Sequence, residues 1–464
     1  MQAAIRIAVV LSSAAASRTV AQDFLALVEW GRSQCNMTIH FDLELWTTGV
    51  RDMATRVPLK ASDTIFMIPD KCLIASADAD RHPSTYGIFD PQRASESPER
   101  SVLYAKQGSV SSMLLPLYLL HLMDEGDEGF FAPYVRMLPK DVNNFVCLWD
   151  LEDEDGPASL LPFHTLVDLF AFCRKIRAMY NDISAAVPDF AQRRSFADWQ
   201  RAWLLANSRD INVTVDGVEQ HSLAPVLDLF NHDMQAPFRW DHVPGGINSV
   251  IKRTNASDGR FYEDEDVVVP AGTALRISYG QYSQSELLLY YGFTLPCGWE
   301  TRWRSLLPNH TATSSASHHR APMDAAASMC RDRLRLRTES AEYELSATRD
   351  GTDDAAFLEG VRQRSDQPAD GEALMWSEVR RLISAVQFPL DSIEEAGASL
   401  EAATPGSREY DALNVLVGQW SVAMAWISHA TEKQRDHETQ SEGAPSGAPS
   451  EAADHGMAQE ACEQ

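Results

Sequence analysis

Three short segments in the middle of the chain hold the side chains that could do chemistry. They supply an arginine, an aspartate, an amide, a histidine and two tyrosines: Arg209, Asp228, Asn231, His232, Tyr279 and Tyr291. An amide offers both a donor and an acceptor, and a tyrosine hydroxyl can direct a hydrogen bond at a reacting atom. Each residue alone also has an ordinary role, as a helix-end charge, a turn former or a core aromatic. The segments follow one another at intervals of about 20 and about 50 residues, and this order favours a shared site.

The same segments resemble the signature motifs of a known family. Ser208-Arg209, the block Pro225 to His232, Ser278 to Gly280 and Tyr291 to Phe293 are similar to motifs of SET-domain methyltransferases. The resemblance is to the subgroup that includes the Rubisco large-subunit lysine methyltransferases and the actin-histidine methyltransferase. Weaker matches extend it over about 23–300, at Gly49 to Thr55, Thr64 to Pro69 and Tyr134 to Pro139.

This resemblance implies S-adenosylmethionine (AdoMet) as the cofactor. Main-chain groups of Gly49 and Val50 are then expected to contact the cofactor. Asn231 and His232 are expected to hold its amino-acid end and its adenine, and Tyr279 to lie beside the methyl group. No metal site is expected, because the chain has no cluster of zinc ligands.

The resemblance also assigns the catalytic residues and implies a protein substrate. In such enzymes the cofactor and the target amine meet through a narrow channel, where alignment and exclusion of water lower the barrier. Tyr279 is expected to orient the nucleophile and the methyl group, and Tyr291 to form the other wall of the channel. Arg209 and Asp228 are expected to pair and to fix the active-site loops.

Arg51 is a departure from the family pattern. It replaces the second glycine of a turn that passes close to the cofactor in the family. Its side chain could crowd that approach, or its guanidinium could pair with the cofactor carboxylate. The first possibility keeps a second hypothesis open, in which the chain is a catalytically silent SET-fold binding module.

The acceptor is expected to be lysine on a non-histone protein, with histidine as the alternative. The residue after Arg209 is Asp210, whereas the histidine-specific relative has an amide there. An acid suits a cationic lysine better. The sequence therefore favours a protein-lysine N-methyltransferase over a protein-histidine N-methyltransferase.

Short sheets and helices must position these residues, and the predicted fold class is α+β. Hydrophobic spacing predicts a helix over 20–35 and largely helical structure over 158–210. Short twisted sheets from 36–80 and 215–300 are expected to form the SET core around a helical insertion, 108–210. The expected order is an N-terminal extension, a SET domain, an all-helical C-terminal domain that resembles the family's substrate-binding domain, and a disordered acidic tail: 1–22, 23–300, 301–433 and 434–464.

The charge of the chain narrows the class of partner. A net charge of −26 disfavours nucleic acid, because an acidic surface repels the phosphate backbone. A basic protein or peptide suits this surface through long-range steering. No apolar run reaches the roughly 18 residues of a membrane helix, so no membrane association is expected. We expect a monomer.

The seven cysteines are scattered and odd in number. This pattern argues against a disulfide framework and favours a reducing compartment. A cytoplasmic location is therefore expected. Residues 1–22 contain Arg6, Arg18 and no acid, which keeps organellar targeting open beside a nuclear location.

Overall fold

The computed structural model describes most of the chain between its two ends. The described residues are 19–40, 43–46, 51–60, 63–88, 90, 92–105, 111–151, 153–215, 217–233, 236, 238–251, 253–254, 261–262, 268–280, 282–295, 333–337, 341–346, 352–364 and 371–442. The chain divides into two compact units. Unit 1 comprises Met1–Asp332 with Phe388–Gly418, and unit 2 comprises Arg333–Gln387 with Gln419–Gln464.

The predicted N-terminal helix is confirmed as α1, Val20–Cys35. The side chain of Thr19 accepts from the backbone of Gln22, and the Gln22 side chain accepts from the backbone of Thr19. This reciprocal capping box satisfies two amide groups that a helix start leaves unpaired. At the other end Asn36 takes the left-handed conformation that commonly ends a helix. Helix α1 begins at Val20, so its first turn falls within the expected N-terminal extension, 1–22.

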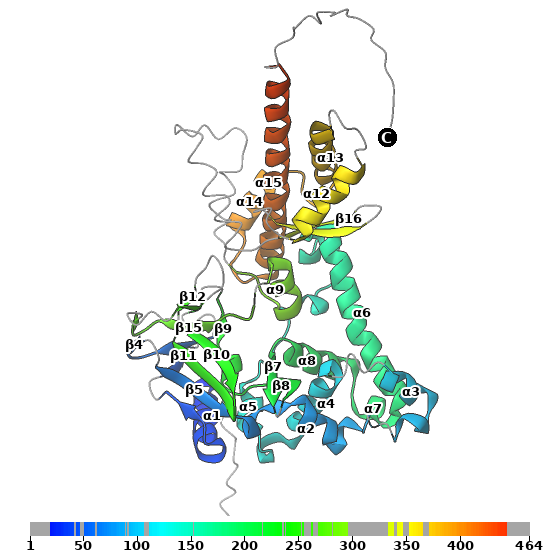
Figure 1. The fold of residues 1–464 in the computed structure, drawn as a ribbon. Coiled ribbons are helices and arrows are strands. Elements are labelled where there is room, and N and C mark those ends of the chain that lie inside the picture. Colours follow the sequence, from blue (N-terminus) through cyan, green and yellow to red (C-terminus); the bar gives the residue numbers. More distant parts are fainter. Residues whose placement is uncertain are drawn as a thin grey trace, which may run out of the picture. The chain divides into compact units, whose positions relative to one another are not determined.

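Short sheets form the core of unit 1, as predicted (Figure 1). One has the order β1-β5-β11-β10, a second β2-β3-β15-β9 and a third β6-β8-β7. Two further pairs are β12-β13 and β14-β4. The strands of the three larger sheets are β1 Thr38–Ile39, β2 Leu43–Trp46, β3 Asp52–Thr55, β5 Thr64–Pro69, β6 Ile74–Ala75, β7 Asp210–Val215, β8 Val218–Leu223, β9 Asn231–His232, β10 Phe238–Val243, β11 Gly246–Ile251 and β15 Ala274–Ile277. The two pairs are β12 Arg253–Thr254 with β13 Phe261–Tyr262, and β14 Val268–Val269 with β4 Leu59–Lys60.

The second sheet gives the site its register. Its strand β15 pairs antiparallel with β3 and parallel with β9, so that Arg276 lies opposite Asn231 and Ile277 opposite His232. Two segments 45 residues apart in sequence are thereby fixed side by side, since ladder hydrogen bonds set which residues face each other. The short strand β9 is what brings the Asn-His block to the sheet.

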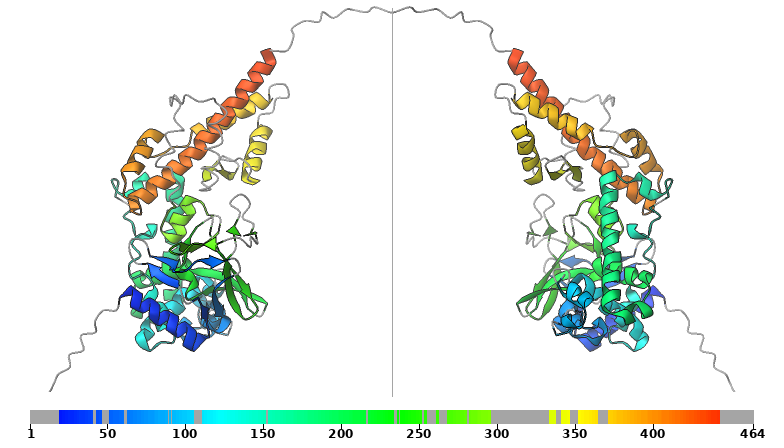
Figure 2. Two further views of the ribbon diagram at one scale, coloured as in Figure 1. Left: turned by 90° about the vertical axis from the view of Figure 1, so that its left-hand side faces the viewer. Right: turned by 90° about the vertical axis from the view of Figure 1, so that its right-hand side faces the viewer.

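The predicted helical insertion is helical, and it packs on the third sheet (Figure 2). Its helices α4 and α8 pack along each other, and α4 also packs on β8. Trp199 and Trp203 of α8 are among the largest fully buried side chains, which explains the aromatic spacing of that segment. The helices of this region are α4 Ser111–Glu125, α5 Ala132–Met137, α6 Phe163–Ala186, α7 Pro188–Arg193 and α8 Phe196–Asn207, preceded by α2 Ser76–Arg81 and α3 Pro98–Ala105.

The C-terminal region is helical, but it is not entirely so. Beside α12, Thr352–Arg364, and α13, Gly371–Ser384, unit 2 has an antiparallel hairpin of β16, Arg333–Arg337, and β17, Glu342–Ser346. The all-helical expectation was therefore wrong at this hairpin, whose buried leucines Leu334 and Leu345 lie opposite each other in the register.

Unit boundaries also differ from the expected division at residue 300. Helix α14, Ile393–Ala402, and the start of α15, Arg408–Glu442, belong to unit 1. The expected acidic tail begins within α15, which continues to Glu442. Residues 443–464 lie outside the described residues, as do 1–18. None of the helices that the structure describes is both long and apolar enough to cross a membrane.

Four cysteines are paired, which corrects the expectation of free thiols. Disulfides join Cys35 to Cys72 and Cys147 to Cys173. Their partners are 37 and 26 residues apart, so neither pair shows in local spacing. The fold brings each pair together. Cys35 is the last residue of α1, and the second bridge joins two elements of the helical insertion. The expectation of a reducing compartment rested on unpaired cysteines, and these two disulfides remove that support.

Candidate active site

Arg209, Asp228, Asn231, His232, Tyr279 and Tyr291 are all described, and the structure brings them into one region of unit 1. Asp228 lies in a short 3-10 helix, η8, Leu227–Leu229, directly before β9. Val226 precedes it with a φ of 79°, a conformation that is costly for a β-branched residue. Complete burial of Val226 holds the backbone there. The strained turn thus positions Asp228 and leads directly into Asn231 and His232 of β9.

Tyr279 follows β15 and lies against His232. The two rings stack with centroids 5.1 Å apart, and the Tyr279 backbone N–H donates to His232 Nδ1 at 3.0 Å. The Tyr279 hydroxyl donates to the Phe230 carbonyl at 2.8 Å. Burial raises the pKa of Tyr279 to about 12, so the hydroxyl keeps its proton at neutral pH. Tyr279 can therefore direct a hydrogen bond but does not serve as a base.

His232 has one buried ring nitrogen without a hydrogen-bond partner among the described residues. Because Nδ1 accepts from the Tyr279 N–H, the neutral ring carries its proton on Nε2. Nδ1 also lies 3.3 Å from the Ile277 carbonyl, a longer approach than the Tyr279 bond. Burial lowers the pKa of His232 and keeps the ring neutral. Nε2 is buried and no described residue accepts from it. Such a donor fits a ligand that has an acceptor nitrogen or oxygen.

Asn231 ties the sheet to the turn where the sequence departs from the family. Its amide nitrogen lies 2.6 Å from the Arg51 carbonyl and 2.6 Å from Asp52 Oδ1. Asp52 in turn pairs with Arg276 at 2.8 Å. The amide nitrogen is thus used by the protein itself, whereas the amide oxygen keeps its acceptor capacity. The cofactor-binding role of Asn231 stays a prediction that rests on this oxygen.

Arg209 and Asp228 are placed as a pair, as the resemblance implies. Arg209 Nε lies 3.5 Å from Asp228 Oδ2, and both side chains are nearly buried. Sequence reasoning missed the third member, Tyr134, whose hydroxyl donates to the same oxygen at 2.8 Å. Burial raises the pKa of Asp228 and that of Tyr134. In the sequence, Tyr134 stood out only as the first residue of the weak match Tyr134 to Pro139, and that match assigns no function to its side chain.

Arg51 faces the same cluster. Its Nη1 donates to the Met137 carbonyl at 2.7 Å, at the end of α5. Burial and the neighbouring Arg209 lower the pKa of Arg51, while Asp228 opposes them. At least one of its donors is therefore used inside the protein. Gly49 and Val50, the other members of that turn, lie outside the described residues.

A cavity of about 70 Å³ lies beside the two tyrosines. The rings of Tyr279 and Tyr291 have centroids 4.9 Å apart, and both residues line the cavity with Asp210 and Trp240. Tyr291 is the last residue of α9, Gln284–Tyr291, a helix that starts with its own capping box. Burial and a hydrogen bond with Tyr282 raise the pKa of Tyr291. The two tyrosines thus stay uncharged near neutral pH, and they share the cavity wall with the ionisable side chains of Arg209, Asp210 and Asp228.

Of one polar pair at the cavity, one member, Asp210, was named from the sequence, but the other, His221, was not. Asp210, which lines the cavity, lies 2.6 Å from His221 Nδ1 across the β7–β8 hairpin. This hydrogen bond raises the pKa of His221. Asp210 was singled out from the sequence, but His221 was not, because a histidine at a strand position carries no signal of its own. Within the described residues, no group of three or more potential ligands could hold a metal ion.

The chain was compared with proteins of known family and structure. No protein-family model matches it. It is 26% identical over 207 residues to Protein SET DOMAIN GROUP 40 of Arabidopsis thaliana, which covers 40% of this chain. The chain matches only 40% of the length of that relative.

Solved structures show the likeness of the fold. Rubisco LSMT bound to AdoMet matches with a TM-score of 0.58 and 14% identity, over 93% of this chain and 98% of that chain. The SET domain of LSMT bound to lysine and AdoHcy matches with a TM-score of 0.57 and 14% identity, over 91% and 94%.

Proposed function

We propose that this chain, which has the SET fold, is an AdoMet-dependent protein methyltransferase that modifies lysine. The observation that carries the proposal is the cavity lined by Tyr279 and Tyr291, together with the stacking of Tyr279 on His232, whose buried Nε2 has no partner among the described residues. The structurally similar Rubisco LSMT was solved with AdoMet, and the LSMT SET domain with lysine and AdoHcy. A small cavity lined by two tyrosines, one of them stacked on the histidine that has the unpartnered donor, fits an amine and a cofactor that meet there.

The residues present fit AdoMet in two respects. His232 Nε2 is a buried donor that needs an acceptor, and the Asn231 amide oxygen can accept from an ammonium. When bound, AdoMet supplies an electrophilic methyl group on sulfur. His232 and Asn231 would hold the cofactor on the side of β9.

Within the site, the protein positions and desolvates the amine rather than removing its proton. Tyr279 and Tyr291 both have raised pKa values, so neither accepts a proton at neutral pH. A lysine that enters a desolvated aromatic cavity is itself favoured in the neutral form. Tyr279 aligns the amine through its hydroxyl, and Tyr291 excludes water from the opposite side. Alignment of this kind supplies much of the rate enhancement in such reactions.

Asp210 favours lysine over histidine as the acceptor. Its carboxylate lies on the cavity wall and can attract an ammonium before the amine enters. Histidine is largely neutral at pH 7 and gains less from that charge. Histidine modification remains the alternative, and so does a silent binding module whose Arg51 closes the cofactor turn.

Transfer of a deuterated methyl group tests the proposal. The purified chain is incubated with deuteromethyl AdoMet and a denatured and a native cell extract, and labelled residues are identified by tandem mass spectrometry. We expect the label on lysine Nε of non-histone proteins. A label on histidine would establish the alternative acceptor. Cofactor binding with no label on any protein would support the silent module and reject the enzyme.

A further inference from the structure

The two disulfides differ in how accessible they are. Cys35 and Cys72 are fully buried, with no exposed surface. Cys147 and Cys173 are both partly exposed. Thiol–disulfide exchange requires a thiolate to reach one of the sulfurs, so exposure decides which bridge reacts. Of the two bridges in the described residues, Cys147–Cys173 is the one whose cysteines are partly exposed, and therefore the one that a reductant can reach in the folded protein.

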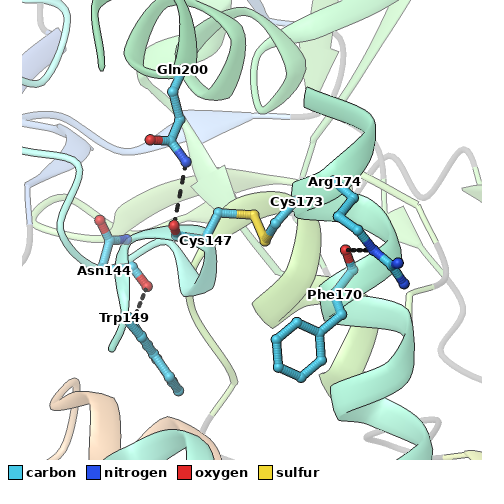
Figure 3. The surroundings of a disulfide bond; sticks show 7 residues. All are labelled: Asn144, Cys147, Trp149, Phe170, Cys173, Arg174 and Gln200. Carbon is cyan, nitrogen blue, oxygen red and sulfur yellow. Dashed lines mark hydrogen bonds between the residues drawn. A yellow bond between two sulfur atoms is a disulfide. The ribbon is translucent and has the colours of Figure 1, made fainter. Parts of the chain in front are cut away.

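This bridge fastens a tight turn to a long helix. Cys147 lies in the 3-10 turn η6, Val146–Leu148, and Cys173 lies in α6 (Figure 3). Gln200 Nε2 donates to the Cys147 carbonyl at 3.3 Å, and Trp149 Nε1 donates to the Asn144 carbonyl at 3.2 Å. The first bond joins the turn to α8 and the second lies within the segment around the turn, whereas the disulfide is the covalent attachment of the turn to α6.

The segment around this turn also holds the end of α9, the helix that carries Tyr291. Asn144 Nδ2 donates to the Gly292 carbonyl at 2.8 Å. Gly292 has a φ of 76°, and a β-carbon there would come within 2.8 Å of the same Nδ2. The close approach therefore depends on the turn and the glycine together. Leu288 of α9 is buried in one cluster with Val146 and Trp149 from either side of Cys147.

The other end of the bridge reaches α9 as well. Phe172, the neighbour of Cys173, makes an edge contact with Tyr290, with ring centroids 5.5 Å apart. Tyr290 directly precedes Tyr291, whose ring lies 4.9 Å from that of Tyr279. Both halves of the bridge are thus one or two contacts from the cavity wall.

We propose that Cys147–Cys173 is a redox modification site through which a dithiol reductant controls the position of α9 and hence methyl transfer. The regulatory part rests on the proposed function of the cavity. The reductant is of the protein dithiol class, with two neighbouring thiols. Oxidised enzyme has a fixed channel wall, and reduced enzyme has a looser one.

The chemistry balances with the dithiol alone. One reductant thiolate attacks a sulfur of the bridge, which breaks the Cys147–Cys173 bond and forms a mixed disulfide, and the other cysteine leaves as a thiolate. The second reductant thiolate then displaces the first cysteine, and the reductant becomes a cyclic disulfide. Two electrons pass from the reductant to the bridge, and the two cysteine thiolates take up the two protons that the reductant thiols lose.

Two measurements on the whole oxidised protein test the proposal. The protein is treated with dithiothreitol under native conditions, its free thiols are alkylated, and modified peptides are identified by mass spectrometry. We expect Cys147 and Cys173 to be alkylated well before Cys35 and Cys72, which serve as the internal control. Simultaneous reduction of both bridges, or earlier reduction of the buried one, would overturn the proposal.

The second measurement is hydrogen exchange before and after reduction. We expect peptides covering 142–149 and 284–292 to exchange about tenfold faster in the reduced protein, because a local opening becomes easier. Peptides of the β7–β8 hairpin, 210–223, should not change. Unchanged exchange over 284–292 would overturn the link to the cavity, and this readout does not depend on any methyl transfer.

Activity then separates regulation from the proposed function. Reduction should lower kcat/KM for the methyl acceptor by about tenfold, and reoxidation should restore it. A Cys147→Ser, Cys173→Ser variant should have the kcat/KM of the reduced enzyme, and dithiothreitol should not change that value. If this variant does not fold, the reduced wild-type protein gives the same comparison. Altered exchange with no activity in either redox state would reject the proposed function while leaving the redox site intact, and equal activity in both states would overturn the regulation.

Discussion

At the scale of single residues, the central feature is a tyrosine that is held neutral. The Tyr279 hydroxyl donates to the Phe230 carbonyl, and its pKa of about 12 leaves it protonated across the working range of pH. Tyr279 and Tyr291 both line the cavity. We therefore expect Tyr279 to have a positioning role in transfer and little role in cofactor affinity.

Tyr279→Phe tests that role. We expect kcat to fall by about 10²–10³-fold, as when one aligned hydrogen-bond group is removed from an active site. The AdoMet Kd should change by less than about threefold, since the stacked ring on His232 is retained. Single-turnover methyl transfer and calorimetry measure the two quantities. Tyr118→Phe, a change of a tyrosine on α4, is the matched control, and full activity of Tyr279→Phe would contradict the assignment.

His221 makes the cavity charge depend on pH. Its pKa is raised by the hydrogen bond with Asp210. The ion pair is fully present below the usual value of 6.5 and is lost as the pH rises through the raised value. Below that value His221 neutralises Asp210, and above it the carboxylate is free to attract a cationic lysine. We therefore expect His221 to tune the first approach of a cationic substrate.

We therefore expect His221→Gln to lower KM for a lysine peptide at pH 6.5 and to have little effect at pH 9. The change should be at most about fivefold, because a half-exposed ion pair contributes up to about 1 kcal/mol. Initial rates over this pH range measure it, with kcat expected to stay constant. A KM that changes equally at both pH values would show a structural effect instead.

At the scale of elements, α15 holds the segment that follows Tyr291. Asp411 Oδ1 accepts from the Thr294 backbone N–H at 3.1 Å and from its hydroxyl at 2.6 Å, and both residues belong to unit 1. Asn414 donates to Thr294 and to Leu295. This buried network joins the first turn of α15 to the end of the Tyr291-Gly292-Phe293 motif.

Asp411 carries a pH dependence whose sign follows from its burial. Burial raises its pKa from 3.8 to about 6, so the folded state holds a proton that the unfolded state releases above about 4. This contribution to stability is present at low pH and is lost between about pH 4 and pH 6, on the order of 3 kcal/mol. Asp411→Asn keeps an acceptor for Thr294 and does not titrate.

We expect the stability advantage of Asp411→Asn over the wild type to be about 2 kcal/mol larger at pH 7.5 than at pH 4.5, where about a third of the pH-dependent loss has already occurred. Urea unfolding followed by tryptophan fluorescence at the two pH values gives the difference in free energy between the proteins. A difference that is the same at both values would mean that Asp411 ionises normally in the folded protein.

At the scale of the whole molecule, the net charge of −26 should act on substrate capture. Long-range attraction raises the association rate of a basic partner and is screened by salt. We expect kcat/KM for a lysine-rich basic peptide to fall by about tenfold between roughly 20 and 200 mM NaCl. A peptide with neutral residues around the same lysine is the control. Equal salt dependence of the two peptides would exclude steering.

Motifs made much of the site predictable from the sequence. Asn231, His232 and Tyr279 carry a recognisable pattern, and the structure places them together through β9 and β15. Tyr134 joins Asp228 from 94 residues away, and Asp411 joins Thr294 from 117 residues away. Hydrogen bonds over such separations leave no local pattern in one sequence, which is why neither partner was foreseen.

In the fold, too, local features were predictable and long-range contacts were not. Helix α1 was predictable because its caps and its apolar spacing are local. The disulfides were not, since each joins cysteines that only the tertiary fold brings together. The β16–β17 hairpin is a different case. Its segment Arg-Leu-Arg-Leu-Arg alternates with the period of a strand, so the signal was present and the helical expectation for 301–433 overrode it.

Calorimetric titration of the purified chain with AdoMet tests the central claim most directly. His232→Asn is the matched control, because an amide oxygen can still accept from the Tyr279 N–H while the Nε2 donor is lost. We expect micromolar binding by the wild type and binding about tenfold weaker by the variant, the loss of one buried hydrogen bond. No heat from folded wild-type protein would contradict the account and would indicate that Arg51 closes the cofactor site.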